Sequence, residues 1–236
     1  DFVRTSISPL SEFNKDFGLL MLPYLYRDTE HMFKVLDGEI GDQFLSSLDS
    51  HNLIGLSWFD GGARNFYNSK KEITSVADLS GMKIRVQESK LMMDLVRALG
   101  ASPTPMAFGD VYSALQTGVI DGAENNWPSI LSTSHYEVAK YIVVDEHTRA
   151  PELILASKMT FDKISEQDQA IIKEAALEAA RFQREEWAKE ELAAEEAVVA
   201  NGNVVTRLES NEEFQNAVQS IYAEFGAGYE DLIEKI

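Results

Sequence analysis

The longest helical pattern in this chain, between Ser165 and Gly202, does most to limit the folds that the chain can adopt. Ser165-Glu166-Gln167-Asp168 resembles a capping box with an acidic first turn, and Asn201-Gly202 is typical of a C-terminal cap. A helix between these ends far exceeds the usual length of about 10–14 residues in globular proteins. We therefore predict that it connects two lobes, with its many Glu and Lys side chains on a solvated face.

Short apolar strands alternate with amphipathic helices through the rest of the chain. The predicted strands cover 52–58, 82–86, 104–108, 121–125, 152–158 and 203–208. The predicted helices cover 28–48 with a break at Gly38, 89–99 between Ser89 as N-cap and Gly100 as C-cap, a segment that starts at Asp110, and 211–236. Strands separated by helices favour an α/β fold with parallel sheets built from βαβ units.

The composition excludes several classes of protein. The chain has 236 residues, enough for two modest α/β lobes, and it has no cysteine for a disulfide framework or a thiolate metal site. No apolar run is long enough to span a membrane, and no signal peptide is visible in this stretch. With 21 Lys and Arg against 39 Asp and Glu, the net charge of −18 argues against a nucleic-acid partner.

Two arginines are the strongest candidates for a binding function. Arg85 closes a short apolar strand that begins at Met82, and Arg64 follows a Gly-Gly pair that ends the preceding strand. Ligands gather at strand ends in α/β sheets, and a guanidinium can bind a carboxylate through two charge-assisted hydrogen bonds. An arginine on a strand is more often solvated or salt-bridged than bound to a ligand. An acidic protein that binds an anion nevertheless needs such a local positive charge.

No enzyme signature is found. The four histidines show no HExxH or closely paired spacing, and the chain has no GxSxG elbow, Walker loop or GxGxxG turn. Asp121 and Glu124 are the closely paired carboxylates nearest the arginine segment, but residues three apart on a strand face opposite sides. We predict no catalytic residue, no metal and no cofactor.

Three segments resemble a known family. The run GASPTPMAFGDVYSALQTGVIDGAEN, from Gly100 to Asn125, is similar to the signature of the DctP-type solute-binding proteins of TRAP transporters. ADLSGMKIRV, which ends at Val86, resembles the family's strand that carries its clamping arginine, and Leu22-Pro23-Tyr24 also fits. The resemblance implies a periplasmic, non-enzymatic protein that passes a small organic acid to membrane subunits of the transporter. Family members are longer, and we expect their opening strand, helix and second strand to be missing from this stretch.

The resemblance also implies a fold and a site. The expected fold is a two-lobe clamshell of mixed sheets flanked by helices, with residues 1–62 and 151–190 in one lobe, 63–150 and 191–236 in the other, and the ligand cleft between them. The main carboxylate clamp falls on Arg85 and a second arginine on Arg64. Asn125 matches a ligand-binding amide of the family, and Phe108 matches an aromatic residue that lines the pocket.

The segment Asn126-Trp127-Pro128-Ser129 is similar to family members that bind sugar acids, particularly hexuronates such as glucuronate and galacturonate. A uronate offers one carboxylate to Arg85, and its hydroxyls need polar partners, while an aromatic ring can cover the apolar face of the sugar. Trp127 also suits a core position, and Glu88 also suits the first turn of a helix. The expected ligand-binding set is Arg4, Arg64, Arg85, Gln87, Glu88, Phe108, Asn125, Asn126, Trp127 and His147.

Three alternatives remain at this point. The ligand of the same family could be a C4-dicarboxylate, lactate or a 2-oxo acid, although a dicarboxylate should need a second cation. A lyase that acts on uronates in a two-lobe cleft would need His147 or Glu124 as its base. A sensory module related to chemoreceptors would have no transporter partner.

Overall fold

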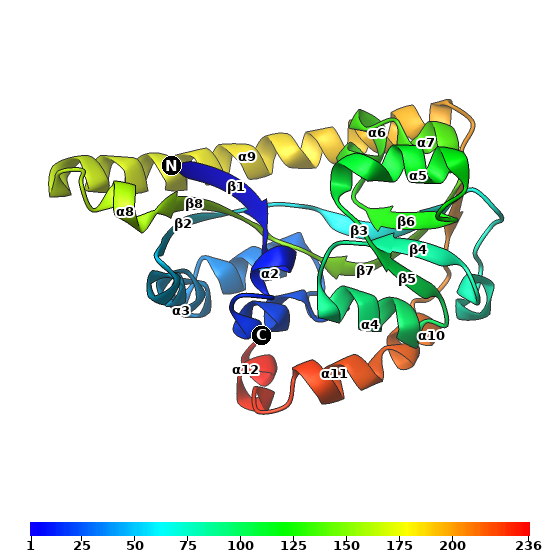
Figure 1. Ribbon diagram of the computed structural model, residues 1–236, viewed down its shortest axis with the longest axis horizontal. Coiled ribbons are helices and arrows are strands. Elements are labelled where there is room, and N and C mark those ends of the chain that lie inside the picture. Colours follow the sequence, from blue (N-terminus) through cyan, green and yellow to red (C-terminus); the bar gives the residue numbers. More distant parts are fainter.

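The computed structural model describes residues 1–236 and contains two β-sheets joined by a long helix (Figure 1). A three-stranded sheet has the order β1-β8-β2, with β1 Phe2–Ser6, β8 Glu152–Ser157 and β2 Leu53–Phe59. A six-stranded sheet has the order β5-β4-β6-β3-β7-β9, with β5 Ser102–Pro105, β4 Lys83–Val86, β6 Gly122–Asn125, β3 Ala63–Asn68, β7 Tyr141–Arg149 and β9 Val204–Arg207.

The helices cover the faces and ends of these sheets. They are α1 Ile7–Leu10, α2 Thr29–Leu36, α3 Glu39–Ser47, α4 Lys90–Ala98, α5 Val111–Thr117, α6 Trp127–Ser132, α7 His135–Val138, α8 Lys158–Phe161, α9 Glu166–Ala200, α10 Glu212–Ala217, α11 Gln219–Phe225 and α12 Glu230–Lys235. Short 3₁₀ turns are η1 Lys15–Met21, η2 Leu48–His51, η3 Val76–Leu79 and η4 Phe108–Asp110.

Helix α9 confirms the long helix predicted from the sequence. Ser165 caps it, because its side chain accepts a hydrogen bond from the backbone N–H of Asp168 and donates one to the carboxylate of the same residue. The helix packs on β2 near its start and on α6 near its end, so it contacts both sheet regions (Figure 1). Its buried side chains are small, mainly alanine, which lets the helix axis lie close to the sheets.

The strand predictions need three corrections. Parallel pairs occur only in the six-stranded sheet, where β4 pairs with β5 and β6, and β7 pairs with β9; the three-stranded sheet is entirely antiparallel. Strands β3 and β7 were not predicted; polar residues interrupt the pattern in β3 and in the second half of β7, although β7 begins with the apolar run Tyr141–Val144. Phe108 lies in the turn η4 rather than in a strand, because β5 ends at Pro105.

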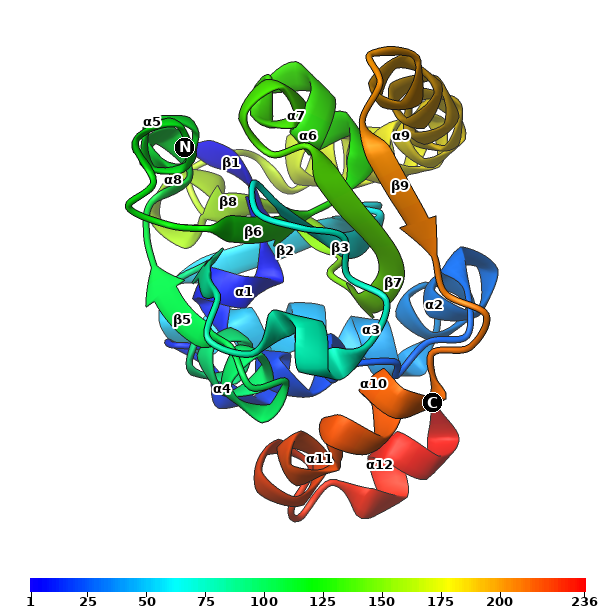
Figure 2. The ribbon, with the colours of Figure 1, turned by 90° about the vertical axis from the view of Figure 1, so that its right-hand side faces the viewer.

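The C-terminal segment also differs from its prediction. Residues 211–236 form three short helices, α10, α11 and α12, instead of one long helix (Figure 2). The chain bends at Val218 and again between Gly226 and Tyr229, where Gly228 has a φ of +86° that favours glycine. The hydroxyl of Tyr222 on α11 donates to the backbone oxygen of Pro23 at 2.8 Å. The segment therefore packs against both α4 and the N-terminal part of the chain.

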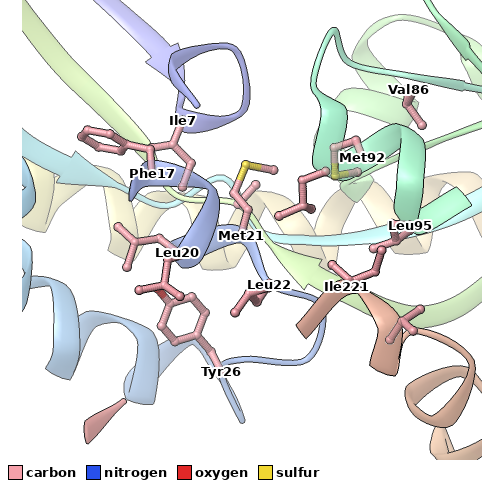
Figure 3. Packing of buried hydrophobic residues seen from close by; sticks show 14 of the residues in the cluster. Ile7, Phe17, Leu20, Met21, Leu22, Tyr26, Val86, Met92, Leu95 and Ile221 are labelled. Carbon is pink, nitrogen blue, oxygen red and sulfur yellow. The ribbon is translucent and has the colours of Figure 1, made fainter. Parts of the chain in front are cut away.

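The largest hydrophobic cluster joins the N-terminal segment to the six-stranded sheet. Met21 from η1, Met92 from α4 and Ile221 from α11 belong to this one cluster (Figure 3). The segment that follows α1 is thus held against α4 by apolar burial. This contact places residues 9–13 beside the loop that follows β4, where the pocket described below is found.

Candidate functional site

An open pocket of about 730 Å³ lies between the segment after α1 and the ends of β4 and β5. One wall consists of Pro9 from α1 with Glu12 and Phe13, and the opposite wall consists of Arg85, residues 87–90, Met93 and residues 105–108. Four residues predicted from the sequence meet here, namely Arg85, Gln87, Glu88 and Phe108. Because β4 and β5 are parallel, their carboxyl ends meet at one edge, as expected for a ligand site in an α/β sheet.

Arg85 is a buried cation with no carboxylate partner. The residue is only 3% exposed, and its Nε and Nη2 atoms both donate to the backbone oxygen of Met106, at 3.0 and 2.7 Å. The guanidinium carbon lies 5.7 Å from the ring centre of Phe108. Burial lowers the pKa of Arg85, which means that the folded chain alone compensates this charge poorly. A ligand carboxylate would supply the missing charge.

Two further polar atoms on the same wall have no hydrogen-bond partner in the chain. They are Oε1 of Gln87 and Oγ of Ser89, and both are buried. Both residues line the pocket, so a polar ligand bound there would supply the missing hydrogen-bond partners.

A second arginine, Arg64, is already paired. It lies on β3, and its Nε and Nη2 donate to the carboxylate of Glu124 on β6, which is itself fully buried. Burial alone would raise the pKa of Glu124, but Arg64 and His147 outweigh burial and lower it to about 2. Arg64 therefore first serves to neutralise Glu124, and only its Nη1 makes no hydrogen bond within the chain.

His147 on β7 extends this cluster. Its Nδ1 is 2.8 Å from a carboxylate oxygen of Asp145, its Nε2 is 3.5 Å from Glu124, and its ring stacks on Phe66. Asp145 also accepts from the backbone N–H of Phe66, where the β3–β7 register shifts. Burial alone would lower the pKa of His147, but Asp145 and Glu124 raise it to about 9.

The buried charges near the pocket do not balance. Arg64, Arg85 and a protonated His147 are positive, whereas only Glu124 and Asp145 are negative. One positive charge remains, and it belongs to Arg85 because the other four groups contact one another. The arrangement suits a ligand with a single negative charge.

The charge of His147 makes stability depend on pH. Its pKa is about 9 in the folded chain and about 6.5 in an unfolded one, so the stabilisation is complete below pH 6.5 and is lost as the pH rises through 9. We expect the free energy of unfolding in urea to fall by on the order of 3 kcal/mol between pH 6.5 and pH 10. His147→Gln should remove most of this fall, and an unchanged slope in that variant would contradict the assignment.

The other predicted ligand-binding residues lie outside the pocket lining. Asn126 caps α6 by accepting from the N–H of Ser129 and donates to the backbone oxygen of Gly61, and Trp127 is buried in the second hydrophobic cluster. Arg4 pairs with Glu152 and lies over Trp187. His147 and Arg64 lie in the buried ion cluster.

Asn125 lies at the end of β6, and its side-chain oxygen accepts from the N–H of Asn126. Its Nδ2 makes no hydrogen bond within the chain. Conversely, the sequence did not predict Ser89 or the wall of Pro9, Glu12 and Phe13 as site residues. That wall comes from a segment far from Arg85 along the chain. A sequence pattern also does not show which way a serine hydroxyl points.

Comparison with known proteins identifies the family. Residues 1–228 match the DctP family, described as bacterial extracellular solute-binding protein, family 7. The chain belongs to this family. A solute-binding protein of Chromohalobacter salexigens is 37% identical over 98% of this chain and 69% of its own length.

Solved structures of this family agree closely with the fold. A TRAP periplasmic solute-binding protein of Bradyrhizobium, solved with galacturonate, has a TM-score of 0.97 and 42% identity, over 100% of this chain and 79% of that one. A counterpart from Roseobacter denitrificans, solved with glucuronate, has a TM-score of 0.96 and 38% identity, over 99% and 78%. A Polaromonas protein bound to D-erythronate has a TM-score of 0.95 and 35% identity, over 100% and 79%.

Family membership settles several predictions made from the sequence. The α/β fold of the TRAP solute-binding proteins is confirmed, and so is the function in solute binding rather than catalysis, which removes the lyase alternative. The predicted location in the periplasm is also confirmed. None of the helices is both long and apolar enough to cross a membrane.

Proposed function

We propose that this DctP-family protein captures a hexuronate such as galacturonate or glucuronate and delivers it to the membrane subunits of a TRAP transporter. The observation that carries the proposal is the buried Arg85, which has no carboxylate partner and faces a pocket with unpaired polar atoms. Solved relatives of this chain hold these two uronates, which supports the choice of ligand class.

In this proposal the ligand carboxylate binds the guanidinium of Arg85. A charge-assisted hydrogen bond contributes about 1.5–3 kcal/mol net, and burial of the carboxylate would be costly without it. Gln87 and Glu88 line the pocket and accept hydrogen bonds from sugar hydroxyls. Asn125 lies outside this lining, and its Nδ2 donates to the ligand when the lobes close. Phe108 is 43% exposed beside Arg85, so its ring is free to cover the apolar face of the sugar.

Closure of two lobes around the ligand belongs to the same proposal. We assign residues 1–62 and 151–190 to one lobe and 63–150 and 191–236 to the other. The pocket lies between residues 9–13 of the first group and residues 85–108 of the second, which supports this division. A ligand that contacts both walls favours the closed state, and the membrane subunits would recognise that state.

A smaller sugar acid is the second candidate. The Polaromonas relative binds D-erythronate, a four-carbon acid, within the same fold. The Arg85 clamp would serve such a ligand equally well, so only the number of hydroxyl contacts separates the two candidates.

Thermal unfolding with a panel of acids tests the proposal. Galacturonate, glucuronate, erythronate, succinate, lactate, pyruvate and neutral galactose are each added to the protein. A ligand at a hundred times its dissociation constant stabilises by about 2.7 kcal/mol, which raises the melting temperature by a few degrees. We expect the largest rise with a uronate and none with galactose. A rise with succinate or pyruvate alone would reject the uronate assignment and keep the transporter family.

A further inference from the structure

Helix α4 begins at the pocket, and its N-terminus is capped by a residue from another segment instead of by its own N-cap residue. Ser89 occupies the N-cap position but makes no capping hydrogen bond. Glu12, from the segment after α1, instead accepts from the backbone N–H of Lys90 at 2.9 Å. Because Glu12 takes over the capping role, the hydroxyl of Ser89 is available for another partner.

The hydroxyl of Ser89 is buried and has no hydrogen-bond partner within the chain. Ser89 is 1% exposed, lines the pocket, and its Oγ makes no hydrogen bond. A buried hydroxyl without a partner is unfavourable, so a ligand that pairs with it gains affinity. Oε1 of Gln87, two residues earlier on the same wall, is also unpaired. Gln87 and Ser89 both line the pocket that Arg85 lines.

The charges around these two residues oppose a second carboxylate. Glu12 and Glu88 both line the pocket. Lys90 also lines it, but its ammonium group pairs with Asp94 at 2.6 Å and with Glu224. Arg85 is therefore the one cation of the pocket wall without a carboxylate partner. A second ligand carboxylate would meet Glu12 and Glu88 with no free cation.

We propose that Ser89 and Glu12 form a subsite that selects hydroxyl groups and limits the ligand to sugar acids with one carboxylate. The inference rests on the proposed function, because it assumes that Arg85 holds the single carboxylate. Ser89 and Gln87 exchange hydrogen bonds with the hydroxyls at the other end of the ligand. Glu12 keeps Ser89 available by capping α4 and repels a second acid group. The excluded class is the aldarates, which carry a carboxylate at both ends.

Galacturonate and galactarate provide the first test, because they share the configuration of their four hydroxyl-bearing carbons and differ in the second carboxylate. Dissociation constants of both are measured by calorimetry for the wild type and for Glu12→Gln. The glutamine keeps an oxygen that can cap Lys90 but removes the charge. We expect wild-type protein to bind galacturonate much more tightly than galactarate. In Glu12→Gln the ratio of the two dissociation constants should fall about tenfold. The change is no larger because solvent partly screens the charge of Glu12.

The change in this ratio between wild type and Glu12→Gln reports the effect of the Glu12 charge alone. Galacturonate closes to a sugar ring and galactarate does not, but this difference between the two ligands is the same for both proteins. An unchanged ratio would overturn the role of Glu12. Wild-type protein that binds both acids equally would overturn the inference and leave the proposed function intact. If neither acid bound, the proposed function would fail, and this inference would fail with it.

Ser89→Ala provides the second test, with Ser57→Ala as its matched control. Ser57 is also 1% exposed with an unpaired Oγ, but it lies in a separate crevice between β2 and α9. We expect Ser89→Ala to weaken galacturonate binding roughly three- to tenfold, without loss of stability in the ligand-free protein. Ser57→Ala should leave binding unchanged. Equal affinities of the two variants would overturn the assignment of Ser89.

Discussion

Arg85→Met is expected to weaken uronate binding by about 100-fold or more, because it removes two charge-assisted hydrogen bonds to the ligand. The methionine keeps the apolar part of the side chain. Stability of the ligand-free protein should stay the same or rise, since Arg85 is a buried charge that no carboxylate of the chain neutralises. Calorimetry gives the affinity, and urea unfolding without ligand gives the stability.

Arg85→Lys is the informative companion to this variant. Lysine keeps the positive charge but lacks the planar fork of donors, so its affinity should fall between those of wild type and Arg85→Met. A lysine variant equal to wild type would mean that Arg85 acts only as a point charge. Binding by Arg85→Met within tenfold of wild type would remove Arg85 from the site.

Glu124→Gln is expected to destabilise the fold by about 3–5 kcal/mol, because it leaves Arg64 as a buried charge without a partner. The protonated His147 also loses one of its two carboxylates. Urea unfolding measures the change at pH 7, where Glu124 is ionised in the wild type. This effect should appear without any ligand, in contrast to that of Arg85→Met.

The double variant Arg64→Met with Glu124→Gln tests whether the loss of stability comes from the broken ion pair or from the packing of the two side chains. If the cost of Glu124→Gln comes from the unpaired arginine, removal of both charges should recover much of the lost stability. Strictly additive losses in the two single variants would show that the two side chains stabilise the fold independently. The affinity of the double variant for the ligand would also report how much Nη1 of Arg64 contributes to binding.

The sequence predicted the regular parts of this fold well. The long helix α9 was found because Ser165 and Asn201-Gly202 are strong end signals, and Gly38 marked the break between α2 and α3. Strand β3 was missed because Arg64 and its other polar residues hide the apolar pattern of a buried strand, whereas β7 was missed although it begins with the apolar run Tyr141–Val144. A buried ion pair is stable only when both partners are in place, and the pairing of Arg64 with Glu124 is not visible in either strand alone.

The site was predicted only in part, for a similar reason. The family resemblance located Arg85 and Phe108, and Gln87 and Glu88 follow Arg85 closely in sequence as polar partners for a sugar acid. Asn126 and Trp127 have the residue types of sugar-binding groups, yet Asn126 caps a helix and Trp127 fills the core. Glu12 has no local signal, because its role depends on contact with Lys90, distant along the chain.

The pairing of β1 with β8 has a consequence for the order in which the chain folds. Phe2 lies opposite Ala156, and β8 is the central strand of the three-stranded sheet. The outer strands β1 and β2 therefore cannot pair until β8 has been synthesised, much later along the chain. Closing a loop of roughly 150 residues carries a larger entropic cost than forming local contacts, and folds rich in such pairings form slowly. The small sheet therefore closes only after Glu152–Ser157 has been synthesised, and β1 stays without its partner strand through most of translation.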